Sequence, residues 1–328
     1  MSKIKYLAPG IAFSFVLAIP AWFLGKAFPI IGSPVIGILL GIILSFWSKP
    51  SFLNEGISYS SKKILQLAII MLGFEMNLYT VFKIGGQSLI IILFTLTASF
   101  LTSYLVGKKL KLPRNTSTLI GVGTAICGGS AIAATAPVIK ASDDDIAFSI
   151  STIFLFNIIA VFLFPFLGHL LGMGDNGFGL WAGTAINDTS SVVAAGYSYS
   201  NAAGNFATIV KLARTLFIIP ITLILAVYTS KKTNSEKSYS LKKIFPWFVL
   251  GFLAASIINT SGIFPSSFTK IFAEAGKFCI VIAMCAVGLK TNVKQFKENG
   301  IKPIFLGLCS WAAVAITSLI VQNIIKIW

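Results

Sequence analysis

The sequence predicts an all-α, polytopic membrane protein that forms a single transmembrane domain over residues 1–328, with no soluble domain. Hydrophobic residues make up 56% of the chain and charged residues only 11%, whereas a soluble domain carries roughly 25% charged residues. Apolar runs long enough to cross a bilayer, about 17–25 residues, recur along the whole chain. Two pairs of short segments also echo each other, which predicts inverted repeats and two discontinuous helices.

The apolar runs predict about eleven transmembrane helices, separated by stretches too short for a soluble domain. The first run follows two lysines and resembles a signal sequence, but no small-residue cleavage site follows in "WFLGKAFP", so we expect it to be retained. The predicted spans lie at 7–24, 31–47, 60–79, 87–107, 117–139, 146–167, 178–199, 206–228, 243–261, 274–293 and 302–325.

The net charge of +16 follows the membrane topology and does not indicate nucleic-acid binding. The basic residues gather in alternate loops, which is the positive-inside pattern. It predicts a cytoplasmic N-terminus and an extracytoplasmic C-terminus. The loop at 168–178 fits least well, because it should be cytoplasmic but offers only His169 and Asp175. The basic loops hold Lys3 and Lys5; Lys49, Lys62 and Lys63; Lys108, Lys109, Lys111 and Arg114; Lys231, Lys232, Lys237, Lys242 and Lys243; and Lys290, Lys294, Lys297 and Lys302.

The four cysteines indicate neither a metal site nor a disulfide framework, because all fall inside spans without ligand spacing. They are Cys127, Cys279, Cys285 and Cys309. The sequence shows no set of nucleophile, base and acid, so we expect no enzyme activity. It also shows no nucleotide-binding loop, so an ion gradient would supply the energy for transport.

One echo joins distant parts of the chain. "MLGFEMNL" ends the third span and "AVGLKTNV" ends the tenth, with Gly73 matching Gly288 and Asn77 matching Asn292. The third span runs outward and the tenth inward, so the related ends should lie on opposite faces. That is the arrangement of an inverted repeat. The alternative is chance similarity between apolar segments.

A second echo joins "GTAICGGSAIAA", which begins at Gly123, to "GTAINDTSSVVAA", which begins at Gly183. Irregular backbone survives at membrane depth only inside protein or beside a water-filled cavity. Adjacent glycines weaken a helix, each by about 1 kcal/mol relative to alanine. We therefore predict that both spans are broken, with Ser130 in one copy and Thr189 or Ser190 in the other capping a new half-helix. The alternative is close packing of small residues. By the eleven-span count, the two copies run parallel.

Such breaks would expose amides that suit an anion, and carbonyls that suit a cation or a proton donor. Asp188 at mid-span costs about 2.5–3.5 kcal/mol to insert, so it is expected to bind Na⁺ or carry a proton. Lys211 and Arg214 share one helix face, and a guanidinium suits a tetrahedral oxyanion. Alternatively, Lys211 extends to the membrane surface, and Arg214 pairs with Asp188 or with an acid in the outer loop. Glu75 is expected at an interface, and Asp145 is expected to cap the next helix.

These motifs carry a family resemblance. "GVGTAICGGSAIAATAPVIKA", "GTAINDTSSVVAAG" and "LGFEMNL" together resemble the YeiH-like family of bacterial membrane proteins, to which sulfate export is ascribed. That family is grouped with cation–proton antiporters and bile-acid-type sodium symporters. The resemblance implies a panel region and a core region with two discontinuous helices that cross near mid-membrane, with 124–130 and 187–191 as the crossing segments. The crossing pair in that fold is antiparallel.

The resulting prediction is a secondary active transporter of a small inorganic oxyanion, first sulfate or sulfite, exported across a bacterial inner membrane with H⁺ or Na⁺ coupling. One alternative is a cation–proton antiporter that uses Asp188. A membrane sensor or scaffold is another. The expected partners are the anion and the lipid bilayer, with a homodimer left open and no nucleic acid, metal or other cofactor. The predicted substrate-binding residues are Thr124, Cys127, Gly128, Gly129, Ser130, Thr189, Ser190, Ser191, Lys211 and Arg214, and the predicted coupling-ion residues are Asn187 and Asp188.

Overall fold

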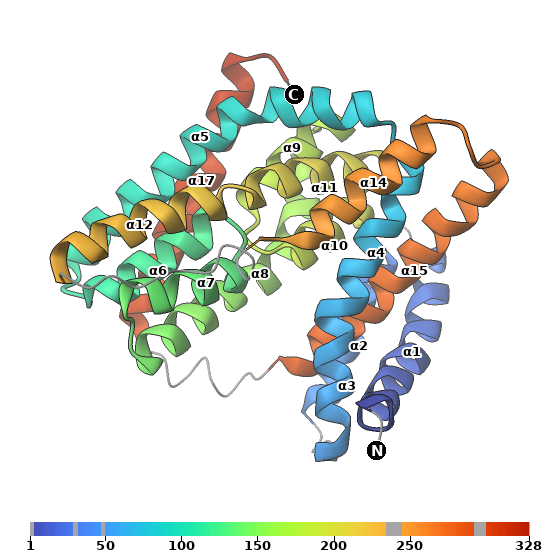
Figure 1. Cartoon of the computed structure of the whole chain (residues 1–328), viewed down its shortest axis with the longest axis horizontal. Helices are drawn as coiled ribbons and strands as arrows, with labels where there is room; N and C mark the ends of the chain where they lie inside the picture. Colours follow the sequence, from blue (N-terminus) through green and yellow to red (C-terminus); the bar gives the residue numbers. More distant parts are fainter. Residues whose placement is uncertain (1–2, 29–31, 47–49, 234–244, 292–299, 328) are drawn as a thin grey trace. The chain divides into compact units, whose positions relative to one another are not determined.

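The fold is entirely helical over the residues that the structure describes, as the composition predicts (Figure 1). The structure is a computed structural model, and it describes residues 3–28, 32–46, 50–233, 245–291 and 300–327. Several residues used in the predictions therefore lie outside the described residues: Lys49, Lys237, Lys242, Lys243, Asn292, Lys294 and Lys297.

Within the part of the chain that the structure describes, six helices are long and apolar enough to cross a membrane, which confirms a polytopic membrane protein. Two shorter apolar helices, Ser33–Ser45 and Trp247–Thr260, accompany them. The six candidate spans are Tyr6–Ala27, Leu78–Lys109, Asp144–Leu170, Asn201–Thr229, Ser267–Lys290 and Ile301–Ile324.

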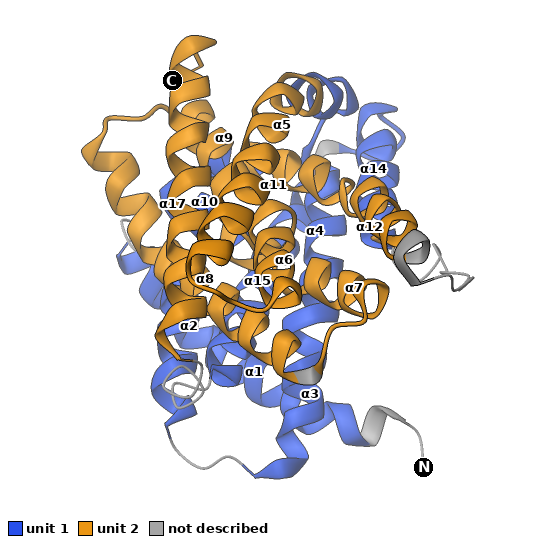
Figure 2. Ribbon diagram, turned by 90° about the vertical axis from the view of Figure 1, so that its left-hand side faces the viewer, with its two compact units in different colours: residues 1–84, 193–205, 247–292 blue, residues 85–192, 206–246, 293–328 orange. Residues whose placement is uncertain are grey.

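The chain forms two compact units from interleaved segments (Figure 2). Unit 1 takes Met1–Ile84, Val193–Asn205 and Trp247–Asn292, and unit 2 takes the remaining segments. Three helices contribute residues to both units: α5 (Leu78–Lys109), α10 (Thr189–Tyr199) and α11 (Asn201–Thr215).

Unit 1 is held together by close helix contacts at glycines. A Cβ on Gly10 would lie 2.7 Å from the Cα of Gly56, and one on Gly41 would lie 2.8 Å from the Cα of Gly288. Small residues let helices approach in this way. Its helices are α1 (Lys3–Ala27), α2 (Ser33–Ser45), η1 (Ser51–Leu53), α3 (Asn54–Tyr59), the π-turn η2 (Ser60–Ile64), α4 (Leu65–Leu72), η3 (Gly73–Glu75), α14 (Trp247–Thr260) and α15 (Ser266–Lys290).

The first echo lies on two antiparallel helices of unit 1. The rings of Phe74 and Phe272 are 5.2 Å apart, and Gly276 lies against Met71. Toward the other end, Ile57 and Leu289 share one buried cluster. The echoed segments therefore end at opposite ends of this helix pair, as an inverted repeat requires.

The echoed glycines also have similar surroundings. A Cβ on Gly73 would lie 2.5 Å from the carbonyl oxygen of Phe252 in α14, and one on Gly288 would lie 2.3 Å from that of Ile38 in α2. Each glycine thus marks the point where its helix touches a neighbour. This shared packing role favours a true repeat over chance similarity.

Unit 2 contains the second echo, and its first copy is a helical hairpin. α6 ends at Ala125 and α7 begins at Gly129, with Gly128 at φ +67° between them. A Cβ on Gly123 in α6 would lie 2.9 Å from the side chain of Ile132 in α7. The helices of unit 2 are α6 (Arg114–Ala125), α7 (Gly129–Ile139), α8 (Asp143–Leu170), α9 (Asp175–Ala185), α12 (Ile218–Thr233) and α17 (Ile301–Ile324).

The start of α8 shows that α7 returns to the side where α6 began. Ser142 caps α8 three residues after α7 ends, in a capping box with Asp145 as predicted for that aspartate. The Asp145 carboxylate accepts a hydrogen bond from Thr116 in the first turn of α6. The segment predicted as a span over 117–139 is broken as expected, but it turns back and does not cross the membrane.

The second copy enters from the opposite side. α8 and α9 are antiparallel, because Asn157 accepts from the amide of Asp188 and Phe164 stacks on Trp181 at 4.2 Å. Since α8 crosses the membrane, α9 begins on the far side from α6. The parallel arrangement expected from the eleven-span count is therefore wrong. The antiparallel arrangement implied by the family resemblance is the observed one.

The direction of α11 and α12 shows on which side of the membrane α10 ends. Tyr228 near the end of α12 accepts a hydrogen bond from Arg114 at the start of α6. The combined span Asn201–Thr229 therefore runs from the far side to the α6 side. A single residue, Ser200, separates the end of α10 from the start of α11, so α10 ends on the far side. α9 and α10 therefore form a second re-entrant segment, which enters and leaves on the far side. The loop at 168–178 then lies on the other side of the membrane from the basic loop at 108–114. Its lack of lysine and arginine therefore agrees with the positive-inside pattern.

Candidate functional site

The two re-entrant segments meet at their breaks, and Lys211 lies where they meet. Its ammonium donates to the carbonyl oxygens of Ile126 at 2.7 Å, Ile186 at 3.0 Å and Asn187. An ammonium has three N–H donors, so all of them are used. Lys211 is fully buried, and the alternative that it extends to the membrane surface is wrong.

Arg214 lies one turn further along α11 and binds the same helix ends. Its Nε donates to the carbonyl oxygen of Ala125 at 2.6 Å, its Nη1 to that of Ile186 at 3.3 Å and its Nη2 to that of Thr124. Arg214 is also fully buried. The partners of its guanidinium are main-chain carbonyls and not the Asp188 carboxylate, so the alternative of a salt bridge between Arg214 and Asp188 is wrong.

These two cations neutralise the negative ends of α6 and α9. The last carbonyls of a helix have no partner within it, and the end carries about half a negative charge. At membrane depth such carbonyls need another partner. The buried Lys211 and Arg214 supply it, which explains why an apolar chain keeps two fixed positive charges in its interior.

Asp188 lies at the positive ends on the other side of the breaks. Its carboxylate accepts from the amide of Ser190 at 3.0 Å and from the Ser190 hydroxyl, so Asp188 caps α10. A Cβ on Gly128, which caps α7, would lie 3.3 Å from the Cβ of Asp188. One carboxylate therefore lies beside two helix starts, where negative charge is favoured.

The capping residues differ from those predicted. The N-cap residue of α7 is Gly128, which offers no side-chain cap, and Ser130 is exposed in the first turn of this helix. In the second copy Ser190 donates to Asp188 and does not accept from the helix. Asp188 takes that place because its carboxylate can accept two hydrogen bonds and also carries the charge that a helix start favours.

Asn157 is the residue that the sequence analysis missed. Its side-chain oxygen accepts the Asp188 amide at 3.1 Å and ties the second break to the middle of α8. The available signal was a single amide in the apolar run "FLFNIIA". A buried polar side chain in such a run usually has a specific partner.

Three polar atoms beside the breaks have no protein partner among the described residues. They are the hydroxyl of Thr124 and both side-chain atoms of Asn187, and these two residues are 0% and 1% exposed. Buried polar groups are rarely left unpaired. A Cβ on Gly129 would meet nothing within 4 Å, so there is free space beside the start of α7. Unpaired groups, a positive helix start and free space together form a candidate ligand site.

The remaining predicted site residues differ in how far they are buried. The free thiol Cys127 is buried in the first break. Thr189 and Ser191 are buried in the first turn of α10. Ser130 is the one predicted site residue whose side chain is exposed.

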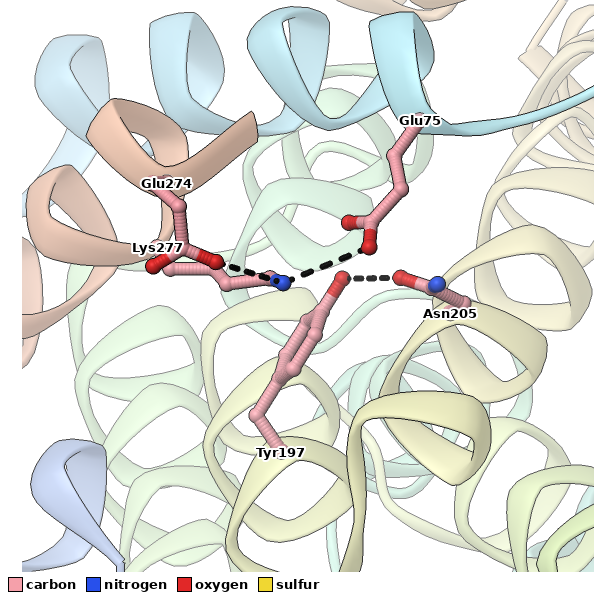
Figure 3. Close-up of polar contacts among 5 residues, drawn as sticks. All are labelled: Glu75, Tyr197, Asn205, Glu274 and Lys277. Carbon is pink, nitrogen blue, oxygen red and sulfur yellow. Dashed lines mark hydrogen bonds and ion pairs between the residues drawn. The ribbon is translucent and has the colours of Figure 1, made fainter. Parts of the chain in front are cut away.

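Unit 1 contains a separate polar cluster (Figure 3). Lys277 lies 3.3 Å from Glu75 and 3.1 Å from Glu274, and the hydroxyl of Tyr197 donates to Asn205 at 2.5 Å. Figure 3 shows these two sets of contacts, one around the Lys277 ammonium and one between Tyr197 and Asn205. Glu75, expected to face an interface, is thus held by an ion pair with α15.

The fold and the site together define a class: an all-helical, polytopic membrane protein in which two oppositely inserted re-entrant segments meet at buried basic residues. A model of the family described as conserved hypothetical protein 698 matches residues 9–307. The chain therefore belongs to that family, the UPF0324 membrane proteins. This membership is consistent with the YeiH-like resemblance.

The similarity to individual relatives extends along nearly the whole chain. A UPF0324 membrane protein of Streptococcus agalactiae is 49% identical over 333 residues, covering 99% of each chain. One of Fusobacterium nucleatum is 46% identical over 340 residues, covering 97% of this chain and 98% of the relative. One of Streptococcus mutans is 48% identical over 334 residues, covering 97% of each. No solved structure matches this chain.

Proposed function

We propose that the protein is a secondary active transporter of a small inorganic oxyanion, first sulfate or sulfite. Two observations carry the proposal: there is free space at the start of α7, and the buried polar side chains of Thr124 and Asn187 at the same two breaks have no partner among the described residues. Helix starts present amides to anions, and discontinuous helices bind anionic substrates in this way in other transporters.

The charge of the site supports an anion. Lys211 and Arg214 contribute two positive charges and Asp188 one negative charge, while the partial charges of two helix starts and two helix ends cancel. The site as a whole therefore carries one net positive charge, which is unfavourable in a buried environment. A bound anion would compensate it.

The residues have different roles in this proposal. Lys211 and Arg214 act through their charge, because their bonded donors go to main-chain carbonyls. Thr124 and Asn187 would contact the anion directly. Asp188 would carry the coupling ion, H⁺ or Na⁺, as it lies next to the same helix starts. The protein would export the anion across a bacterial inner membrane, with the N-terminus cytoplasmic and the C-terminus extracytoplasmic.

The test is transport by the purified full chain in proteoliposomes, with a panel of anions and an imposed H⁺ or Na⁺ gradient. Sulfite or sulfate should be transported, and chloride should not. In detergent, the oxyanion should raise the melting temperature, whereas chloride at equal ionic strength should not. A ligand at about 100 times its dissociation constant adds about 2.7 kcal/mol of stability. Stabilisation by cations alone, with no response to any oxyanion, would overturn the proposal.

Asp188→Asn tests the coupling role. The amide cannot take up a proton or bind Na⁺ as a charge, so gradient-driven flux should disappear while anion exchange continues. Flux is measured against internal and external pH and Na⁺. Unchanged pH and Na⁺ dependence would exclude this role. Asn157→Ala is the matched control, because it removes a contact to the Asp188 amide and leaves the carboxylate.

A cation–proton antiporter is the second candidate, and the partly exposed Asp188 beside the breaks favours it. Na⁺ or Li⁺ would then stabilise the wild-type protein, Asp188→Asn would remove that effect, and oxyanions would have none. A sensor or scaffold would show neither flux nor specific stabilisation. These three outcomes separate the candidates in one set of melting curves.

A further inference from the structure

The carbonyl oxygens at the two breaks form a cage that basic side chains already fill. Lys211 and Arg214 donate six hydrogen bonds into it, and one oxygen accepts from both residues. The oxygens belong to Thr124, Ala125, Ile126, Ile186 and Asn187.

Oxygens of this kind are what a coupling cation needs. Unwound carbonyls and half-helix ends coordinate Na⁺ in transporters with discontinuous helices, and hard cations prefer oxygen ligands. An ammonium is a compact positive charge, and the Lys211 ammonium has every donor engaged. The electrostatic role of a cation at these helix ends is therefore already performed by the chain.

The net charge of the site also argues against a bound coupling cation. With both basic side chains in place the site carries one net positive charge, so a bound Na⁺ would raise it to two in a buried environment. The charging of a buried group without a partner is strongly unfavourable. A bound oxyanion would instead offset the positive charge.

We propose that Lys211 and Arg214 are built-in replacements for a coupling cation, so that the anion moves without Na⁺. This inference rests on the proposed function and restricts which ion can be coupled to transport. Any coupling ion is then a proton on Asp188, whose carboxylate lies at the opposite, positive helix ends.

The first test is counterflow of radiolabelled sulfite in proteoliposomes prepared in sodium, potassium or choline salts. The rates should agree within about twofold, since no cation enters the cage. A tenfold loss of counterflow without Na⁺ would overturn the inference while leaving oxyanion transport intact. If neither sulfite nor sulfate is transported in any of the salts, the result counts against the proposed function. The second test then decides whether basic side chains occupy a cation site in the carbonyl cage.

The second test asks whether removing Lys211 creates a cation site. Lys211→Ala leaves the carbonyl oxygens of Ile126 and Asn187 without their donor and that of Ile186 with Arg214 alone, so its melting temperature in choline chloride should fall on the order of 10 °C. Ammonium, methylammonium or Na⁺ should restore at least half of that loss, because these ions fit where the side chain was. If the variant does not fold in choline, its recovered yield with methylammonium present throughout gives the same comparison.

Lys277→Ala is the matched control. This lysine is bonded to carboxylates in unit 1 and not to carbonyls, so its variant should melt equally in all chloride salts of equal ionic strength. The wild-type protein should behave in the same way. Stabilisation of the wild type by Na⁺, or a Lys211→Ala protein that no cation affects, would overturn the inference.

Discussion

Gly128 is the residue on which the first break depends. Its φ of +67° with ψ −132° is a conformation that side chains rarely adopt, and a Cβ there would lie 3.3 Å from that of Asp188. Holding another residue in such a conformation costs about 1–3 kcal/mol. We expect Gly128→Ala to lower the stability of the purified protein by that amount, measured by thermal unfolding in detergent.

The adjacent Gly129→Ala is the control for this prediction. It lies in the first turn of α7, where a Cβ would meet nothing within 4 Å. Alanine is also the better helix former by about 1 kcal/mol, so this variant should be at least as stable as the wild type. Equal losses for the two variants would mean that the backbone turn at Gly128 is not the constraint.

The structure brings together the charged residues whose type alone implied a buried position, while their role as a binding site stays a prediction. An aspartate, a lysine and an arginine inside apolar runs had to find partners, and all three lie at the breaks. Their partners could not be predicted, because Lys211 bonds to a carbonyl 85 positions away in the chain and every residue has a carbonyl. Asn157 was missed for the same reason, since only the fold brings it to Asp188.

At the scale of helices, the echoed glycines make a prediction about packing. A Cβ on Gly73 or Gly288 would lie within 2.5 Å of a carbonyl oxygen in a neighbouring helix, and backbone atoms cannot move aside as a flexible side chain can. Overpacking of this kind costs about 1–3 kcal/mol. We expect Gly73→Ala and Gly288→Ala to lower the melting temperature by similar amounts.

Gly86→Ala in α5 serves as the comparison. A Cβ at that position would meet nothing within 4 Å, and the helix would gain about 1 kcal/mol in propensity. Its melting temperature should stay level or rise. A Gly288→Ala protein that melts with the wild type would show that α2 and α15 do not approach each other so closely.

At the scale of the whole molecule, the re-entrant segments change the membrane topology. In a background without native cysteines, Lys109→Cys and Asp144→Cys should react with a membrane-impermeant reagent from the same side, since α6 and α7 together return to it. Asn176→Cys should react only from the opposite side. All three positions are exposed, and labelling of intact cells against inverted vesicles makes the measurement.

The eleven-span model predicts a different labelling pattern. It places the residues before 117 and those after 139 on opposite sides, so Lys109→Cys and Asp144→Cys would then react from different sides. That result would contradict the hairpin at Gly128. It would also leave the Asp145–Thr116 hydrogen bond without an explanation.

The sequence by itself determined the class of protein, the position of both breaks and the identity of the charged residues at depth. Each of these follows from local chemistry. Apolar runs, paired glycines and isolated charges behave in the same way in a membrane whatever contacts the rest of the chain makes. Only the tertiary structure decided that the first break reverses the chain and that the basic side chains bind helix ends. Reversal depends on one backbone conformation at Gly128 and on contacts such as Thr116 with Asp145, which join residues that no local pattern relates.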